Sequence, residues 1–420
     1  MKIFLTLFIL ISLASSSFAD PVKIWISSVQ DKKYYEDMLV RYKSIDPDFN
    51  AEVTAFGFME MPDKLSVAMK TGVGTPDIVQ LDEVVYSMFL RGQVPFVDIS
   101  ERVKKADIAK DFHPQRLNLF KQGEQLFGLP QSLSAYVLYY RKDLFDQYGL
   151  TPDDINTWEK LKDIGLELKA EGQKTMPLDP SYFEVLLRQQ GGRLFDEKGK
   201  ALPDFKLAVK TLEYIADLQK NEVAVMPDRG TVFDPVFFSG DVANNEILAI
   251  VGADWYGLDM LQSFCPELKG KWGIAPLPKW AKAKGKSYDS ATFAGQGLMI
   301  YKGSKQVDKS WEFMKWVMTD KEANVARFTD RNSFPAYKPV WSDPRLLAQS
   351  EYFSNEPLGL TVLQVSQELP AISMNAKRGM AVFLMREKYF ASVMMGHQTA
   401  TEALTELKAA LDNPQGQGPK

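Results

Sequence analysis

The chain has 420 residues, 25% of them charged, and its formal net charge is −4 at pH 7. This mixed and nearly balanced charge argues against nucleic acid as the main partner. The length predicts two or three domains, each large enough to bury a core. With only 2 histidines and 1 cysteine, the sequence has almost no ligands for a zinc site and no partner for a disulfide, so we expect no metal and no cofactor.

Residues 1–19 have the features of a cleaved signal peptide. A basic start at Lys2 precedes an apolar run from Ile3 to Leu13, and the small residues Ser17 and Ala19 lead to a cut before Asp20. The run is shorter than the ~20 apolar residues that a membrane anchor needs. No cysteine follows the cut, so we expect no lipid anchor and a freely diffusing periplasmic protein.

Strand-like and helix-like segments alternate after this leader. In order, they are a strand from Val22 to Ile26, a helix with apolar positions at Tyr35, Met38, Leu39 and Tyr42, a strand from Ala51 to Phe58, a helix around Leu65, Ala68 and Met69, and a strand around Ile78, Val79 and Leu81. Such alternation favours an α/β fold with mainly parallel sheets. Ligands then bind beyond the carboxyl ends of strands, at Ser27, Ser28, Asp82 and Glu83.

Nucleotide and catalytic motifs are incomplete. Gly285-Lys286-Ser287 resembles the end of a phosphate-binding loop, but the leading glycine of that motif would fall at Trp280. The sequence contains two carboxylate pairs, Asp82-Glu83 and Asp153-Asp154. Such pairs more often cap helices or face solvent than form the catalytic pair of a glycosidase, and Asp153-Asp154 indicates a helix start. We therefore expect no enzymatic activity.

Aromatic rings stand beside hydrogen-bonding side chains in several predicted loops. This pairing suits a neutral polyhydroxylated ligand, because sugar C–H faces pack on aromatic rings while hydroxyls need polar partners. Trp255 lies beside Asp254 and between two glycines, which favours a role in the site, whereas Phe183 and Phe293 fit a core role and a site role equally well. The segments are Asp179 to Phe183, Gly252 to Gly257, Phe293 to Gln296 and Arg331 to Pro335.

At these and other segments the sequence resembles the bacterial family 1 extracellular solute-binding proteins, the receptors that feed sugar-importing ABC transporters. The resemblance covers nearly all of the mature chain, and its order and spacing are specific. The matching segments are Gly74-Thr75-Pro76-Asp77-Ile78-Val79, Gly128-Leu129-Pro130, Leu138 to Phe145, Tyr148-Gly149-Leu150, Thr157 to Leu161, Gly270 to Pro278, Lys302 to Lys305, Ser310 to Phe313 and Phe334-Pro335-Ala336. Arg141 and Trp25-Ile26-Ser27 depart from the usual family pattern, which leaves the identity of the ligand open.

The resemblance implies two lobes, each a mainly parallel sheet flanked by helices, joined by a hinge of several strands. One lobe would comprise residues 20–131 and 295–334, and the other residues 132–294 and 335–413. The composition of residues 414–420, rich in Gly, Pro and Gln, predicts a flexible tail. Pro130 fixes its own φ and restricts Leu129, so an extended crossing is expected there on physical grounds as well.

The resemblance also implies a receptor that binds a sugar between its lobes, closes like a hinge and delivers the ligand to the permease subunits of an ABC importer. We expect it to act as a monomer. Asp82 and Glu83 from one lobe and Asp254 from the other are expected to accept hydroxyl hydrogen bonds. Trp255, Tyr182 and Tyr136 are expected to supply stacking faces, and Gln296 lies at a crossing between the lobes.

Other functions stay open at this point. A receptor of the same fold could take a charged solute such as a polyamine, a glycerol phosphodiester or iron, and the adjacent Tyr139 and Tyr140 are a superficial cue for iron. A carbohydrate hydrolase would turn over an oligosaccharide, and a purely structural protein would bind no small ligand at all.

Overall fold

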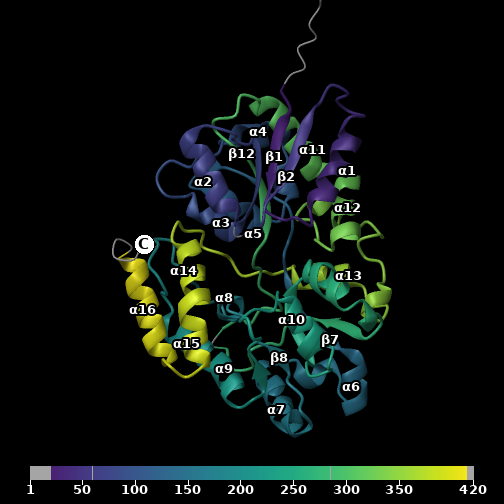
Figure 1. Cartoon of the computed structure of the whole chain (residues 1–420), viewed down its shortest axis with the longest axis vertical. Coiled ribbons are helices and arrows are strands. Elements are labelled where there is room, and N and C mark those ends of the chain that lie inside the picture. Colours follow the sequence, from purple (N-terminus) through teal and green to yellow (C-terminus); the bar gives the residue numbers. More distant parts are fainter. Residues whose placement is uncertain (1–19, 59, 284, 414–420) are drawn as a thin grey trace, which may run out of the picture.

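The computed structural model describes residues 20–58, 60–283 and 285–413. The chain forms two α/β lobes, which stand one above the other in Figure 1. The predicted signal peptide and the tail 414–420 lie outside the described residues. No helix in the described ranges is both long and apolar enough to cross a membrane.

The upper lobe is built on a five-stranded sheet with the order β2-β1-β3-β12-β6. The first three of these strands are parallel, and β12 runs antiparallel to both of its neighbours. β3 is buried along its whole length because it lies at the centre of the sheet, whereas the edge strand β2 alternates between exposed and half-buried positions. The strands are β1 (Val22–Ile26), β2 (Ala51–Ala55), β3 (Ile78–Asp82), β6 (Leu129–Pro130) and β12 (Gln296–Ile300).

Helices cover this sheet as the sequence pattern predicts. The first of them buries Tyr35, Met38 and Tyr42 on one face. The main helices of this lobe are α1 (Lys32–Tyr42), α2 (Met61–Thr71), α3 (Glu83–Met88), α4 (Ser100–Ala106), α5 (Pro114–Leu117), α11 (Val307–Thr319) and α12 (Lys321–Arg331). The last two come from late in the chain, so the upper lobe is completed only after the chain has passed through the lower one.

The lower lobe centres on a three-stranded sheet with the order β10-β7-β11. The central strand β7 runs antiparallel to both neighbours, whereas the parallel pairing expected for this lobe joins β8 to β9 and recurs at the isolated bridges of Thr157 with Lys279 and of Lys174 with Ile247. The strands are β7 (Tyr136–Arg141), β8 (Met176–Pro177), β9 (Ala224–Val225), β10 (Ala249–Ala253) and β11 (Trp272–Ala275). The helices are α6 (Lys142–Tyr148), α7 (Trp158–Leu168), α8 (Ser181–Gln189), α9 (Phe205–Lys220), α10 (Pro235–Phe237) and α13 (Leu358–Val365). The Asp153-Asp154 pair lies in a short 3-10 turn, where Asp154 completes a capping box with Thr151.

Three crossing segments lie side by side between the lobes. β6 pairs with β12, the backbone N–H of Gln131 donates to the carbonyl of Gln296, and Ser132 forms a bridge with Pro335. The extended crossing expected at Leu129 and Pro130 is therefore confirmed, and it belongs to a hinge of more than one strand.

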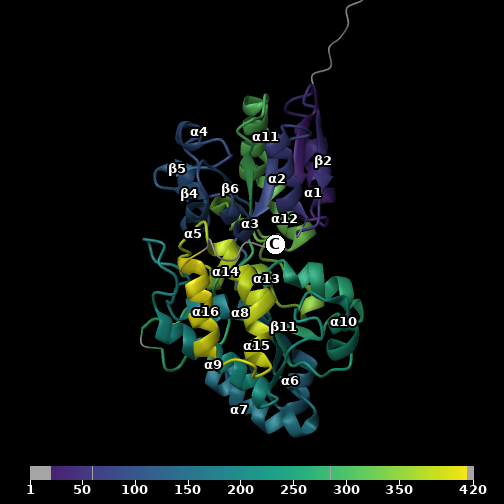
Figure 2. The same cartoon turned by 60° about the vertical axis from the view of Figure 1, so that its left-hand side comes forward.

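The C-terminal helices contact both lobes. They are α14 (Arg378–Leu384), α15 (Phe390–Met394) and α16 (Ala400–Asp412). α16 packs against α9 of the lower lobe, while α14 packs against α3 of the upper lobe, as Figure 2 shows from a second side. The backbone N–H of Gly379 also donates to the Ser87 hydroxyl, at 2.9 Å. This contact holds the start of α14 against the upper lobe.

Candidate ligand site between the lobes

Asp82, Glu83 and Gln296 lie together where β3 and β12 end at the lower side of the upper lobe. Asp82 is paired in register with Gln296. Its carboxylate accepts the Val84 N–H at 2.7 Å and so caps α3, which is the role that short polar side chains commonly take at a helix start. The sequence predicts Asp82 and Glu83 at the end of a strand and Gln296 at a crossing between the lobes. In the structure β3 ends at Asp82 and β12 begins at Gln296, and Asp82 also caps α3.

Glu83 binds two arginines rather than facing solvent. Its oxygens lie 2.8 Å from Nη1 of Arg116 and 3.0 Å from Nη2 of Arg378, and all three side chains are buried. Arg378 also pairs with Glu184 of α8 in the lower lobe, at 3.0 Å. Arg378 thus links a carboxylate of each lobe, and we name Glu83, Arg116, Glu184 and Arg378 the hinge ion cluster.

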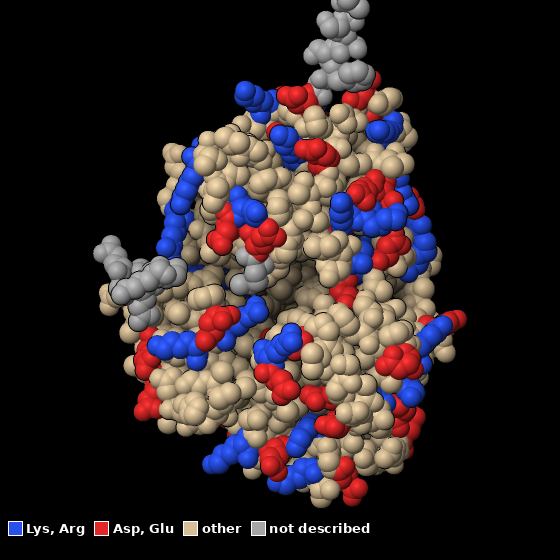
Figure 3. All heavy atoms as spheres, viewed as in Figure 1, with Lys and Arg blue, Asp and Glu red and all other residues tan. Residues whose placement is uncertain are grey.

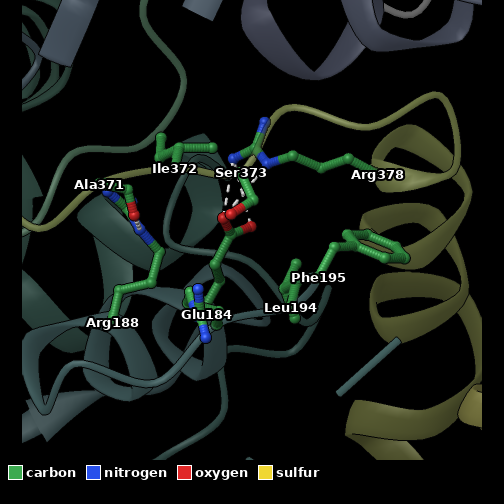
Figure 4. A pocket seen from close by; sticks show the side chains of 9 residues that line it. Glu184, Arg188, Leu194, Phe195, Ala371, Ile372, Ser373 and Arg378 are labelled. Atoms are coloured by element: carbon green, nitrogen blue, oxygen red, sulfur yellow. Dashed lines mark hydrogen bonds and ion pairs between the residues drawn. The ribbon is translucent and has the colours of Figure 1, made fainter. Parts of the chain in front are cut away.

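Arg188 lies beside the hinge ion cluster on the same helix as Glu184. Its guanidinium donates to the carbonyls of Thr292 and Pro370, which tie α8 to two separate stretches of chain. Together with Glu184, Arg378 and Ser373 it lines a small pocket, in which the Arg378 guanidinium points at the Glu184 carboxylate (Figure 4). This side of the interlobe region is therefore rich in buried charge.

Burial and neighbouring charge act on the two adjacent carboxyls in opposite directions. Burial, reinforced by the charge of Glu83, raises the pKa of Asp82 above its ordinary value. For Glu83 burial opposes ionisation, but Arg116, Arg378 and Arg188 outweigh it and hold the pKa of Glu83 below its usual range. Of the two adjacent carboxyls, Glu83 is therefore the one that favours the ionised form.

Asp254 and Trp255 follow β10 at the upper side of the lower lobe. One oxygen of Asp254 accepts the backbone N–H of Phe334 at 2.6 Å, while Oδ1 is buried without a hydrogen-bond partner. Burial raises the pKa of Asp254 to about 7, although the N–H of Phe334 and the charge of Arg116 act against that rise. An unpartnered oxygen beside the hinge is a ready acceptor for a hydroxyl group.

Trp255 stacks on Phe233, which the sequence analysis did not select. Their ring centroids lie 5.9 Å apart with an angle of 20° between the planes. Phe233 is 36% exposed and Trp255 is half-buried, and the indole Nε1 has no partner. The pair offers the flat aromatic surface that stacking on a sugar requires.

The two predicted tyrosines are buried. Tyr136 and Tyr182 are each 1% exposed, and the Tyr182 hydroxyl donates to the Val251 carbonyl at 2.7 Å. Neither ring presents a face to solvent in this structure. Their stacking role stays a prediction.

The upper lobe contributes a row of amides and a second aromatic pair. Gln80 donates to Gln131 at 2.9 Å, and Gln131 donates to Gln296 at 3.3 Å. Trp25 and Phe56, at the carboxyl ends of β1 and β2, meet edge to face with centroids 4.8 Å apart. Both lobes therefore place rings and hydrogen-bonding groups at their facing ends.

The molecular surface is hollowed between these ends. Figure 3 shows the depression between the two lobes, with Lys, Arg, Asp and Glu mixed over the surrounding face rather than gathered as one sign of charge. No group of His, Cys, Asp and Glu within the described ranges could hold a metal ion. The mixed charges of this face suit a ligand of balanced polarity.

Sequence reasoning missed the arginine partners of the hinge ion cluster. One local signal was available: Glu184 and Arg188 stand four residues apart in α8 among Phe183, Val185, Leu186 and Leu187, so one charged stripe interrupts an otherwise apolar helix. Arg378 and Arg116 carry no comparable local pattern. Phe233 was also missed, because only its stacking on Trp255 distinguishes it.

The paired lobes, the crossing strands and the hollow between them define a two-lobed periplasmic-binding-protein fold. Among solved structures, the GacH receptor of Streptomyces glaucescens GLA.O, crystallised unliganded and with acarbose, aligns with a TM-score of 0.77 at 20% identity, covering 93% of this chain and 97% of that one. This likeness confirms the expected fold.

The chain belongs to the bacterial extracellular solute-binding protein family, whose sequence model matches residues 26–324. It is 27% identical over 335 residues to the arabinooligosaccharide-binding protein of Bacillus subtilis (strain 168), covering 78% of this chain and 76% of that protein. It is 24% identical over 316 residues to the lactose-binding protein of Rhizobium radiobacter, covering 72% and 71%. Membership of the family expected from the sequence motifs is confirmed.

Proposed function

We propose that the protein is a periplasmic receptor that binds a sugar, or a sugar derivative, between its lobes and delivers it to the permease of an ABC importer. The observation that carries this proposal is the Phe233 and Trp255 stack, which lies beside the unpartnered Asp254 oxygen at the end of the lower lobe that faces the amide row. Rings and hydrogen-bonding groups in this combination recognise the two chemical faces of a sugar.

The relatives named above favour a carbohydrate over a charged solute. Those named above are described as binding arabinooligosaccharide, lactose and acarbose. The site itself carries charges of both signs: Glu83 and Glu184 pair with Arg116 and Arg378, and Arg188 lies beside them.

Export, oligomeric state and the boundaries of the lobes belong to the same proposal. Residues 1–19 would be removed on export and the mature protein would act as a monomer without a lipid anchor. The lobes would be residues 20–131 with 295–334 and residues 132–294 with 335–413, although α14 packs against α3 across that division. The ligand would lie between Asp82, Glu83 and Gln296 of one lobe and Asp254 and Trp255 of the other, with Tyr136 and Tyr182 close beneath.

A thermal-shift screen tests the ligand class. The panel contains arabinooligosaccharides, maltooligosaccharides and lactose, with spermidine and glycerol 3-phosphate as charged comparators. A ligand that binds only the folded protein adds about 2.7 kcal/mol of stability at a hundred times its dissociation constant. We expect a neutral saccharide to raise the melting temperature and to change tryptophan fluorescence. A response confined to the charged compounds, or cleavage of a saccharide by the pure protein, would overturn the proposal.

A further inference from the structure

The segment from Arg331 to Phe334 in the upper lobe is held by the lower lobe at two points. Arg331 is the last residue of α12, and Asn332 ends that helix in a left-handed conformation with φ of 49°. Nη2 of Arg331 pairs with Asp259, and the N–H of Phe334 is bound by Asp254. Asp254 and Asp259 stand on either side of Trp255 in the sequence.

On the upper side, Arg331 is joined to a carboxylate that the sheet holds in place. Its Nε lies 3.4 Å from Oδ1 of Asp31. The other oxygen of Asp31 accepts hydrogen bonds from Gln80 at 2.7 Å and from Gln131 at 3.2 Å. Asp31 therefore couples Arg331 to the amide row and to the loop that follows β1.

On the lower side, Asp259 belongs to the helical turn that carries the aromatic stack. Asp259 lies in the π-helical turn η6 (Gly257–Gln262), and its backbone N–H donates to the Trp255 carbonyl at 3.0 Å. Any movement of Asp259 relative to the upper lobe must therefore move the backbone of Trp255 as well. We name the contacts among Asp31, Arg331 and Asp259 the Arg331 bridge.

The Arg331 bridge differs from the hinge ion cluster in what anchors it. Arg331 is 17% exposed, Asp259 15% and Asp31 10%, so water reaches all three, whereas Glu83, Arg116 and Arg378 are at most 1% exposed. The hinge ion cluster is also fastened to the upper lobe through the packing of α14 on α3. α12 packs on α1 and α11, and η6 packs beside η7 (Pro266–Leu268), so Arg331 and Asp259 are carried by elements of different lobes. α12 and α14 lie on opposite sides of the molecule in Figure 1.

We propose that Arg331 is a positioning residue that holds the two lobes together before ligand arrives and thereby sets how tightly the ligand is bound. The inference rests on the proposed function of the cleft as a ligand site. A receptor whose binding-competent form is only partly populated binds with an affinity reduced by that fraction. A contact that favours the closed form without touching the ligand therefore strengthens binding.

The first experiment needs no ligand. Small-angle scattering compares the ligand-free wild type with Arg331→Gln, Asp259→Asn and Arg331→Lys. We expect a larger radius of gyration for Arg331→Gln and Asp259→Asn, and an intermediate value for Arg331→Lys, which keeps the charge. Arg102→Gln is the matched control, because Arg102 of α4 pairs with Asp308 of α11 within the upper lobe. Identical curves for wild type and both neutral variants would overturn the inference.

The second experiment measures affinity by calorimetry with the saccharide that the screen identifies. We expect Arg331→Gln and Asp259→Asn each to raise the dissociation constant about tenfold, mainly through faster release, while Arg102→Gln leaves it unchanged. A lower melting temperature with unchanged affinity would mean that the bridge is only structural, which contradicts the inference. If the wild type binds no saccharide, the proposed function fails, and the scattering result still decides the role of the bridge.

Discussion

The carboxylate of Asp254 accepts the backbone N–H of Phe334 at 2.6 Å, although the two residues stand 80 positions apart in the chain. The bond joins the end of a lower-lobe strand to a crossing segment, and it uses only one of the two carboxylate oxygens. The second oxygen remains buried and unpartnered. Asp254 is thus a structural link of the hinge that keeps one carboxylate oxygen free to accept a further hydrogen bond.

Asp254 should give the protein a pH-dependent stability. An unfolded aspartate loses its proton near pH 4, whereas burial raises the pKa of Asp254 to about 7 in the native protein. Between these values the native state binds more protons than the unfolded state, so the free energy of unfolding falls as the pH rises from about 4 to 7. Asp254→Asn should flatten this dependence and melt higher than wild type at pH 8.

Scanning calorimetry from pH 4.5 to 8 checks this expectation, with Asp37→Asn on the exposed face of α1 as the control. The control should keep the wild-type slope. An Asp254→Asn variant with an undiminished slope would show that the native protein ionises Asp254 at low pH.

Truncating the aromatic stack should weaken binding without unfolding the lobe. We expect Trp255→Ala to lose about 1 to 3 kcal/mol of binding free energy, which is about 5- to 150-fold in affinity. Phe233→Ala should cost less, because Phe233 supports the indole from one side. Trp280→Ala is the comparison, since Trp280 packs on Trp158 and Tyr214. Titration calorimetry that finds Trp255→Ala as tight as wild type would remove Trp255 from the site.

The hinge ion cluster should behave as one unit. Arg378→Met leaves the buried Glu83 and Glu184 without their shared partner, and we expect a loss of about 3 to 5 kcal/mol in the free energy of unfolding. Glu184→Gln removes one of the two buried carboxylate charges that shared Arg378. The double variant should therefore lose less stability than the sum of the single ones, measured by urea denaturation. Strict additivity would mean that the residues do not interact.

Gly295 should tolerate no side chain. A Cβ at this position would lie 1.5 Å from Nη2 of Arg116, against the guanidinium that binds Glu83. We expect Gly295→Ala to destabilise the protein by about 1 to 3 kcal/mol, as overpacking does. Gly240→Ala is the matched control, because its Cβ would meet nothing within 4 Å. Equal melting temperatures for the two variants would refute the close approach of Arg116.

The parts of the fold that depend on local chemistry could be predicted from the sequence. Pro130 fixes its own φ and restricts Leu129, which favours an extended backbone there, and the apolar spacing of Tyr35, Met38 and Tyr42 predicts a helix that covers a core. Both expectations are confirmed. The direction of β7 was not predictable in this way, because a buried strand is continuously apolar whether its neighbours are parallel or antiparallel.

The site was harder to predict, because it is assembled from distant residues. Arg378 meets Glu83 across 295 positions of sequence, and nothing near either residue indicates that α14 folds back on α3. Tyr182 and Trp255 have similar polar and aromatic neighbours in the sequence. Only the packing of α8 beneath β10, where the Tyr182 hydroxyl meets Val251, distinguishes the buried ring from the half-buried one.

The sheet of the upper lobe is assembled from strands that lie far apart in the sequence, which affects the order in which the protein folds during synthesis. β3 lies between β1 and β12, and β12 begins only at Gln296, after the strands of the lower lobe. A growing chain therefore exposes one edge of β3 until most of its length has been synthesised. Contacts of such long sequence separation form slowly, so the sheet of the upper lobe should be completed only after the strands of the lower lobe have been synthesised.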